Sequence, residues 1–206
     1  VNRASVLQLV ANPPRRGQGP LMVKDVISAR PAPGLYIVAT PIGNAGDITL
    51  RALDLLARCD LVLCEDTRVT AKLFAIHNIQ AKTAPYHDHN AAEMRPRVMK
   101  RLEAGEAIAL VSDAGTPLVS DPGFKLVQEA VAAGHNVTAL PGASSVLAAL
   151  TLAGLPTDRF FFAGFLPSKQ EARRKELAEL AAIPATLVFL ESANRLAAVL
   201  ADMAAA

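Results

Sequence analysis

The chain has 206 residues, 51% of them hydrophobic, so it is long enough for one large or two modest domains with apolar cores. Its formal net charge of +2 does not by itself indicate a body that binds RNA. No apolar run approaches the roughly 18–20 residues of a membrane span, and the first thirty residues lack the pattern of a secretory signal. The two cysteines, Cys59 and Cys64, indicate neither a disulfide framework nor a zinc site. We therefore expect a cytoplasmic protein without membrane contact.

Residues 1–33 contain many prolines and glycines and little periodicity, and we predict that they form a disordered basic extension. Residues 1–30 carry five basic side chains against one acid, Asp25, a net +4 that leaves −2 for residues 31–206. The extension is either a contact for nucleic acid or a solvated tail, and the sequence leaves both open.

From Gly34 onward, strand and helix patterns alternate strictly, which predicts an α/β fold with a parallel sheet and right-handed crossovers. Two helix starts carry capping signals: Asn90 with Glu93, and Asp121 with Pro122. The expected strands are 35–39, 61–65, 82–86, 107–111 and 136–140, and the expected helices are 49–57, 70–76, 90–103 and 122–133.

A second, smaller α/β unit is expected after a boundary near residues 145–154. It comprises a helix to about Ala153, strands at 160–164 and 186–190, a charged helix opened by a capping box of Ser168 with Glu171, and a helix from about Asn194. We predict domains at 34–145 and 146–206, the second incomplete because two strands bury too little to stand alone.

Five polar or glycine-bearing loops follow predicted strands, at residues 40–47, 65–68, 86–90, 112–121 and 141–145. In a parallel sheet these loops share one edge, so we expect them to converge on one ligand site. The first loop lacks the Gly-x-Gly-x-x-Gly spacing of a dinucleotide site, and none has the lysine of a phosphate loop. A ligand with few or no phosphates fits better.

Two of these loops carry candidate chemistry. Glu65, Asp66 and Arg68 put two carboxylates and a guanidinium directly after an apolar strand, which is either a capped helix start with a local ion pair or part of a cleft. His87 and His89 lack a clear third ligand, so we favour hydrogen bonding to substrate over a metal site. The basic run Lys169, Arg173, Arg174 and Lys175 is read mainly as a solvated helix face, with RNA phosphate contact as the alternative.

Taken in order, five motifs closely resemble the ribosomal RNA small subunit methyltransferase I family of the tetrapyrrole methylase superfamily: Gly34–Asn44, Cys64–Arg68, Val111–Pro117, Ser120–Gly123 and Pro141–Ser144. The resemblance implies a two-domain enzyme, usually a homodimer, that binds S-adenosylmethionine in the cleft between its domains. It also implies that the methyl acceptor is the ribose 2′-hydroxyl of a cytidine in 16S rRNA, either in free RNA or in the small ribosomal subunit. It further implies a donor site formed by Pro41, Gly43, Asp113, Gly115, Thr116, Val119, Ala143, Ser144 and Ser145.

The chain also differs from related patterns. Thr116 and Asn44 stand where tetrapyrrole-methylating relatives commonly have Asp, which favours the ribosomal branch over the alternative of a tetrapyrrole or corrin acceptor. Where the family usually reads Glu-Ser-Pro-His-Arg, this chain has Glu191-Ser192-Ala193-Asn194-Arg195. Because the family's sequences continue beyond residue 206, we expect part of the donor cleft to be missing here.

Methyl transfer from a sulfonium demands in-line alignment, and a ribose hydroxyl must lose or share its proton to become a good nucleophile. We therefore expect Glu65 and Asp66, together with His87 or His89, to orient or deprotonate this hydroxyl. Arg68 is expected to bind a carboxylate or an RNA phosphate. Asn90, Glu191 and Arg195 are expected to contact substrate, and no metal is required.

Overall fold

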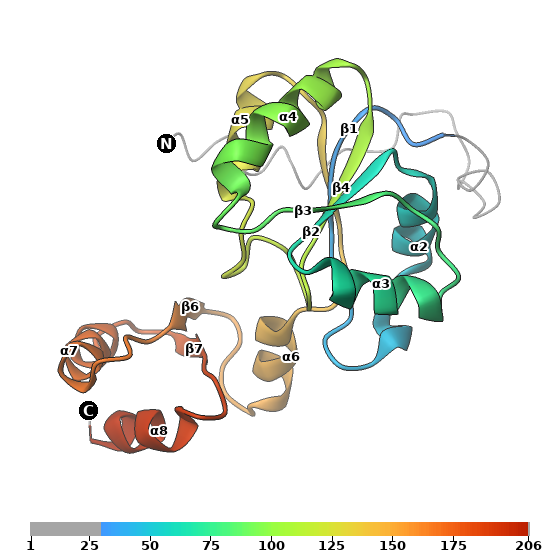
Figure 1. Cartoon of the computed structure of the whole chain (residues 1–206). Helices are drawn as coiled ribbons and strands as arrows, with labels where there is room; N and C mark the ends of the chain where they lie inside the picture. The colour runs from blue at the N-terminus through green and yellow to red at the C-terminus, as the bar shows by residue number, and fades with distance from the viewer. Residues whose placement is uncertain (1–29, 206) are drawn as a thin grey trace. The chain divides into compact units, whose positions relative to one another are not determined.

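The structure is a computed structural model that describes residues 30–205 (Figure 1). Most of the predicted extension at 1–33 therefore lies outside the described residues, and the prediction of disorder is not addressed there.

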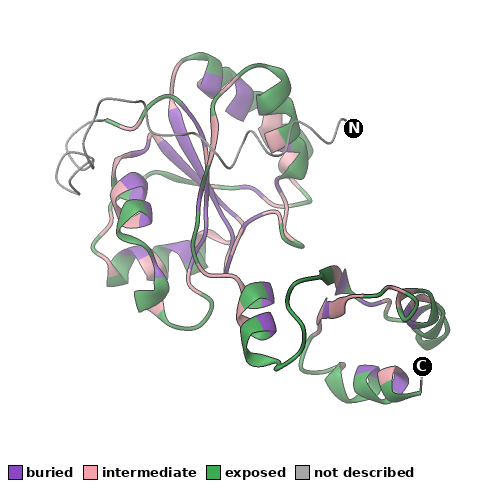
Figure 2. Ribbon diagram, turned by 180° about the vertical axis from the view of Figure 1, so that it is seen from behind, coloured by how far each residue is buried: buried purple, intermediate pink, exposed green. Residues whose placement is uncertain are grey.

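The central element is a five-stranded sheet in which every pair of neighbours is parallel. Its strands are β1 (Gly34–Val38), β2 (Leu61–Cys64), β3 (Thr83–Pro85), β4 (Ala107–Val111) and β5 (Val137–Leu140). The strand order β3-β2-β4-β1-β5 places β4 and β1 at the centre. Strands β2 and β4 are buried along their whole length, as a sheet covered on both faces requires, and Figure 2 shows the buried centre in purple. The predicted parallel α/β sheet is confirmed.

Two helices cover each face of the sheet: α2 (Leu50–Arg58) and α3 (Thr67–Ile76) on one, α4 (Ala91–Glu103) and α5 (Phe124–Ala132) on the other. A short 3₁₀ turn, η1 (Ala45–Asp47), precedes α2. Leu56 and Phe74 of the first pair pack in one apolar cluster, whereas Val98 and Leu126 of the second pair pack in the other. Each helix thus buries one apolar face against the sheet. On α5 this face is Leu126 and Ala130, so a predicted stripe of Phe124, Val127 and Val131 is wrong, since Phe124 and Val131 are exposed.

The C-terminal part contains α6 (Ser145–Leu152), β6 (Phe160–Phe165), α7 (Gln170–Leu180), β7 (Thr186–Leu190) and α8 (Leu196–Ala204). Strands β6 and β7 form a separate two-stranded parallel sheet. Val146 and Leu150 of α6 pack on Val188 of β7, while Leu177 of α7 packs on Val199 of α8. None of the helices between residues 30 and 205 is both long and apolar enough to span a membrane.

Two of the predicted helix starts are wrong in detail, and a third differs in its chemistry. Helix α5 begins at Phe124 after Gly123, whose φ of 129° suits only glycine, so Asp121 and Pro122 lie in the loop. Helix α7 follows Lys169 without any side-chain cap, so Ser168 does not form the predicted capping box. Asn90 does precede α4, but its amide accepts from His87 N (2.9 Å) and donates to Pro85 O (3.0 Å) instead of capping the helix.

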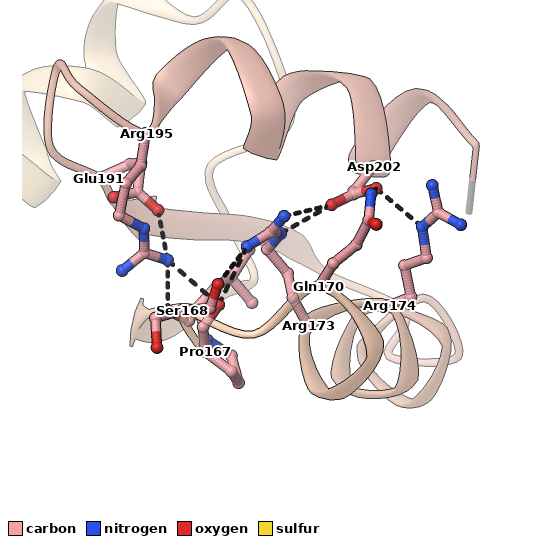
Figure 3. A network of polar contacts seen from close by, with 9 residues as sticks. Pro167, Ser168, Gln170, Arg173, Arg174, Glu191, Arg195 and Asp202 are labelled. Atoms are coloured by element: carbon pink, nitrogen blue, oxygen red, sulfur yellow. Dashed lines mark hydrogen bonds and ion pairs between the residues drawn. The ribbon is translucent and has the colours of Figure 1, made fainter.

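The prediction of a solvated basic face on α7 is wrong for Arg173, which is only 5% exposed. Its Nε donates to Asp202 Oδ2 of α8 at 2.8 Å, and its Nη1 donates to the carbonyls of Pro167 and Ser168 (Figure 3). Arg174 Nε donates to Asp202 Oδ1 at 2.7 Å from the solvent side. The buried carboxylate of Asp202 on α8, which the basic run itself does not reveal, turns Arg173 inward and binds Arg174 at the surface.

Candidate functional site

The loops that follow β1 and β4 are joined directly at the carboxyl edge of the sheet. Thr40 N donates to Gly115 O at 2.9 Å, and Gly115 N donates to Thr40 O at 3.0 Å. The Thr40 hydroxyl also donates to Ser112 O at 3.0 Å. These two reciprocal bonds form an isolated antiparallel bridge just beyond the parallel pairing of β1 with β4, and they fix the Gly115 backbone.

The loop after β5 attaches to the same centre. The Thr116 hydroxyl donates to Ala143 O at 3.0 Å, although the two residues are 27 positions apart. Gly142 lies so close to the end of β1 that a Cβ on it would be 2.8 Å from the Ala39 Cβ. Thr116 and Ala143, two of the predicted donor-binding residues, therefore lie side by side.

The loop after β2 is tied to the loop after β4 through Asp113, whose Oδ1 accepts from Asp66 N at 3.1 Å. His87 and His89, from the loop after β3, line the same cavity as Glu65, Asp66 and Asp113. Loops following all five strands thus gather along one edge of the sheet, as expected for parallel strands. That they form a single ligand site stays a prediction.

Two cavities open along this edge and share Asp113. The first, which we call the neutral cavity, has a volume of about 210 Å³ and contains no lysine or arginine. Gly43 has open space where a Cβ would stand, so a ligand can reach its backbone. The neutral cavity is lined by Thr40, Pro41, Gly43, Ala45, Val69, Thr70, Leu73, Ile76, Ser112 and Asp113.

The second, which we call the acidic cavity, has a volume of about 470 Å³. It is lined by Glu65, Asp66, Thr67, Arg68, Pro85, His87, His89 and Asp113. It therefore holds all five residues predicted to carry the chemistry.

The two adjacent carboxylates of the acidic cavity have opposite environments. Burial raises the pKa of Glu65, and the nearby carboxylates of Asp113, Asp121 and Asp88 raise it further. By contrast, hydrogen bonds from Arg68 lower the pKa of Asp66 to about 2. Glu65 is consequently the better proton acceptor of the two.

Asp66 and Arg68 mainly satisfy each other. Arg68 Nε donates to Asp66 Oδ1 at 3.0 Å and its Nη2 donates to Oδ2 at 2.6 Å. Asp66 Oδ1 also accepts from Arg68 N at 2.8 Å, which makes Asp66 the N-cap of α3. The sequence allowed either a capped helix start with a local ion pair or part of a cleft. The structure shows both, because the capped start of α3 and its ion pair lie at the wall of the acidic cavity.

The histidines stand edge to face, with ring centroids 6.0 Å apart. His87 Nδ1 is buried and has no hydrogen-bond partner among the described residues. A buried polar nitrogen without a partner is costly, which makes this atom of a residue at the cavity wall a candidate hydrogen-bonding group for a ligand.

The remaining predicted residues lie away from the two cavities. Val119 is 37% exposed in the loop after β4, and Ser144 caps α6, of which Ser145 is the first residue. Arg195 Nη2 donates to Leu166 O at 2.7 Å and pairs with Glu191 at 3.0 Å, so both hold the segment after β6 (Figure 3).

Sequence reasoning missed several residues of the neutral cavity. Thr40 and Ser112 begin two of the five loops that the sequence singles out, but neither is among the residues predicted to bind the donor. Leu73 and Ile76 of α3 gave no signal, because in the sequence they look like an ordinary apolar helix stripe.

Comparison with known proteins gives one family and a set of close relatives. The family model of tetrapyrrole (corrin/porphyrin) methylases matches residues 34–206. The chain is 56% identical over 178 residues to a ribosomal RNA small subunit methyltransferase I from Mesorhizobium japonicum, covering 86% of this chain and 60% of that protein. The protein of that name from Escherichia coli O157:H7 is 48% identical over 171 residues, covering 83% and 60%. The chain thus spans about 60% of the length of these relatives.

Solved structures share the fold at low sequence identity. A uroporphyrin-III C-methyltransferase from Thermus thermophilus, complexed with S-adenosyl homocysteine, superimposes with a TM-score of 0.58 at 24% identity, covering 84% of this chain and 76% of that one. A diphthine synthase gives a TM-score of 0.63 at 19% identity, covering 83% and 72%.

Proposed function

The chain belongs to the tetrapyrrole methylase family, and from this premise we propose that it transfers a methyl group from S-adenosylmethionine to the ribose 2′-hydroxyl of a cytidine in 16S rRNA. Its curated relatives at about half identity carry a ribosomal RNA name, whereas the porphyrin enzyme is 24% identical. This contrast favours RNA over a tetrapyrrole as the acceptor.

The neutral cavity and its neighbouring loops suit the methyl donor. S-adenosylmethionine combines a sulfonium, an amino acid and a nucleoside, and it carries no phosphate. Its recognition calls for backbone groups, hydroxyls and a carboxylate, and the neutral cavity offers these groups. When bound, the donor supplies an electrophilic methyl group on sulfur. We assign its binding to Pro41, Gly43, Asp113, Gly115, Thr116, Val119, Ala143, Ser144 and Ser145.

The acidic cavity would hold the acceptor ribose. Glu65, with its raised pKa, accepts the proton of the 2′-hydroxyl, and the buried Nδ1 of His87 bonds the same ribose. Asp66 orients Arg68, whose largely exposed side chain can meet an RNA phosphate, and His89 lies at the cavity wall. Asn90, Glu191 and Arg195 act indirectly by holding loops.

The observation that carries this proposal is the position of Asp113. It borders both cavities and accepts a hydrogen bond from the backbone beside Glu65, so donor and acceptor would meet across one side chain. Such alignment is the main requirement of an in-line methyl transfer.

The test is methyl transfer with labelled donor to three acceptors: 16S rRNA, 30S subunits and uroporphyrinogen III. We expect label in RNA, at a cytidine whose 3′ linkage becomes resistant to alkali, and none in the porphyrin. Glu65→Gln should lower turnover at least about 100-fold with donor affinity within about twofold. Labelling of the porphyrin alone would contradict the proposal, and equal losses of donor binding and turnover would contradict the role of Glu65.

Three further statements belong to this proposal. We infer that the protein is cytoplasmic. We also infer that it forms a homodimer, which is supported by the exposed apolar side chains of Leu152, Leu155 and Phe160. We also infer that residues 34–145 and 146–206 belong to two domains with the donor between them, supported by Gly164 of β6 lying near Ser120. Sedimentation velocity tests the dimer, since a monomer at all concentrations would contradict it.

A further inference from the structure

A third cavity, with a volume of about 290 Å³, lies outside the donor and acceptor sites assigned above. It forms between the start of α4 and the start of α5. Its main lining side chains are Tyr86, Asp88, Arg95, Asp121, Phe124 and Lys125. We call it the lateral cavity.

The lateral cavity adjoins the acidic cavity through one short segment. His87 and His89 line the acidic cavity, whereas Asp88 between them lines the lateral one. The carboxylates of Asp88 and Asp121 also act electrostatically on Glu65. Because consecutive residues line the two cavities, a group bound in the lateral cavity would be a neighbour of the ribose proposed above.

An aromatic ring stands at this cavity without a packing reason. Phe124 is 66% exposed, while Leu126 and Ala130 of the same helix are buried in the core. Exposed aromatic rings beside basic side chains are the usual platforms on which unstacked RNA bases lie.

The polar groups of the cavity suit a base better than a phosphate. Asp88 and Asp121 offer acceptors that would repel a phosphate. Arg95 offers donors, and it is held in place by an ion pair from its Nε to Glu129 Oε2 at 2.6 Å. A base that presents an amino group next to ring acceptors matches this combination, and a carboxylate accepting from cytosine N4 is an established pairing.

We propose that the lateral cavity receives the base of the nucleotide to be methylated, stacked on Phe124, and selects a base with an exocyclic amino group over uracil. This inference rests on the proposed function and adds a specificity site to it. Uracil would place its O4 against the carboxylates, where neither partner has a proton to donate.

The experiment compares three RNAs of one sequence that carry cytidine, uridine or 2-pyrimidinone riboside at the methylated position. The last lacks only the N4 amino group. We expect transfer to cytidine to exceed transfer to either analogue at least about tenfold. Asp121→Asn should reduce this preference severalfold, because an amide can also donate to O4, and Phe124→Ala should weaken RNA binding about tenfold.

Matched controls come from exposed positions of the two helices that form the cavity. Val131→Ala on α5 and Glu103→Gln on α4 should leave both the base preference and RNA affinity unchanged. Donor affinity, measured by calorimetry, should stay within about twofold for all four variants.

The outcomes separate the two proposals. RNA methylation that does not distinguish cytidine from 2-pyrimidinone, or that keeps its preference in Asp121→Asn, overturns the base site and leaves the proposed function standing. Loss of donor affinity in Phe124→Ala with RNA affinity intact also overturns it, because the cavity would then hold the adenine of the donor. No methylation of any RNA by the unaltered chain contradicts the proposed function itself.

Discussion

Glu65 and Asp66 are adjacent in the chain, but their surroundings separate their chemistry. Asp66 caps α3 and binds Arg68, which keeps its carboxylate ionised and its pKa at about 2. Glu65 faces three further carboxylates and is partly buried, which raises its pKa. Two titratable groups pushed in opposite directions commonly mark the division between a proton acceptor and a positioning group.

The raised pKa of Glu65 predicts a specific pH dependence. A base must be deprotonated to act, so methyl transfer should fall as the pH drops through the pKa of Glu65, which lies above its ordinary value. Asp113 is the first of the carboxylates that raise it, and Asn at this position keeps an oxygen to accept from Asp66 N. Asp113→Asn should therefore move the acidic limb of the kcat profile to lower pH.

The matched comparison is Asp66→Asn. Asn caps a helix about as well as Asp, and the carboxylates that raise the pKa of Glu65 are those of Asp113, Asp121 and Asp88, not that of Asp66. We expect this variant to leave the acidic limb in place. If the limb did not move in Asp113→Asn, or moved equally in both variants, Glu65 would not be the titrating base.

Gly142 offers a second prediction at the scale of one residue. A Cβ there would stand 2.8 Å from the Ala39 Cβ, which is attached directly to the backbone of the loop after β1 and cannot rotate away. Gly142→Ala should cost about 1–3 kcal/mol in the free energy of unfolding, by overpacking. It should also weaken donor binding about tenfold or more, because both loops border the proposed donor site.

Gly46→Ala is the control, since its added Cβ would meet only the movable end of the Asn44 side chain. Urea unfolding and calorimetry measure the two effects. Unchanged donor affinity in Gly142→Ala would argue that the loop after β5 does not contribute to the donor site.

At the scale of elements, α7 and α8 are held together by a buried ion pair. Asp202 is 1% exposed and accepts from Arg173, Arg174 and Gln170, while Arg173 also satisfies two carbonyls of the loop after β6 (Figure 3). Removing one partner of a buried pair leaves the other without compensation.

This arrangement predicts unequal effects for two neighbouring arginines. Arg173→Gln should lower the free energy of unfolding by about 3 kcal/mol, because it leaves the buried Asp202 carboxylate without its main partner and the carbonyl of Ser168 without its donor. Arg174→Gln should cost much less, since its side chain is 57% exposed. Thermal unfolding of the two variants provides the measurement, and similar losses in both would show that burial does not decide the contribution.

The same pair predicts a loss of stability in acid. Hydrogen bonds from the arginines lower the pKa of Asp202 to about 2, so its contribution is complete above the ordinary aspartate pKa. It should disappear as the pH falls from about 4 to about 2, because protonation then becomes coupled to unfolding. Asp202→Asn should show a flatter decline of the melting temperature over this range than the unaltered chain, and parallel declines would contradict the assignment.

The sequence predicted the strands and helices well because their apolar patterns are local. All strand positions of the sheet are confirmed, and β4 and β7 match residue for residue. Helix starts were less certain, because a capping residue can be recruited elsewhere. Asn90 bonds the preceding loop, and Asp121 lies three positions before Phe124, where α5 begins without a side-chain cap, so neither side chain caps the helix that its motif suggests.

At the scale of the whole molecule, the edge of the sheet could be predicted because parallel strands bring their following loops together. The sequence could not predict which contacts each side chain makes at this edge. Asp113 borders two cavities and bonds Asp66, which lies 47 positions away in the chain. Arg173 turns inward to bond Asp202, which lies 29 positions away. Arg195, expected at the substrate, holds the backbone after β6 by a similar long-range bond.

A site assembled from distant loops should respond to its ligand as one unit, and this is the last prediction. S-adenosylhomocysteine, the product left by the donor, should raise the melting temperature and slow hydrogen exchange in residues 113–119 and 142–145 together. Thr116 already bonds Ala143, so a ligand that orders one loop should order the other.

Hydrogen exchange followed by mass spectrometry resolves the two segments, and the segment around Glu103 on α4 serves as an internal reference that should not change. Protection confined to one loop would mean that the ligand contacts a single strand end. Protection of both with equal dependence on ligand concentration is expected, because a single binding event must order both sides of the Thr116–Ala143 contact.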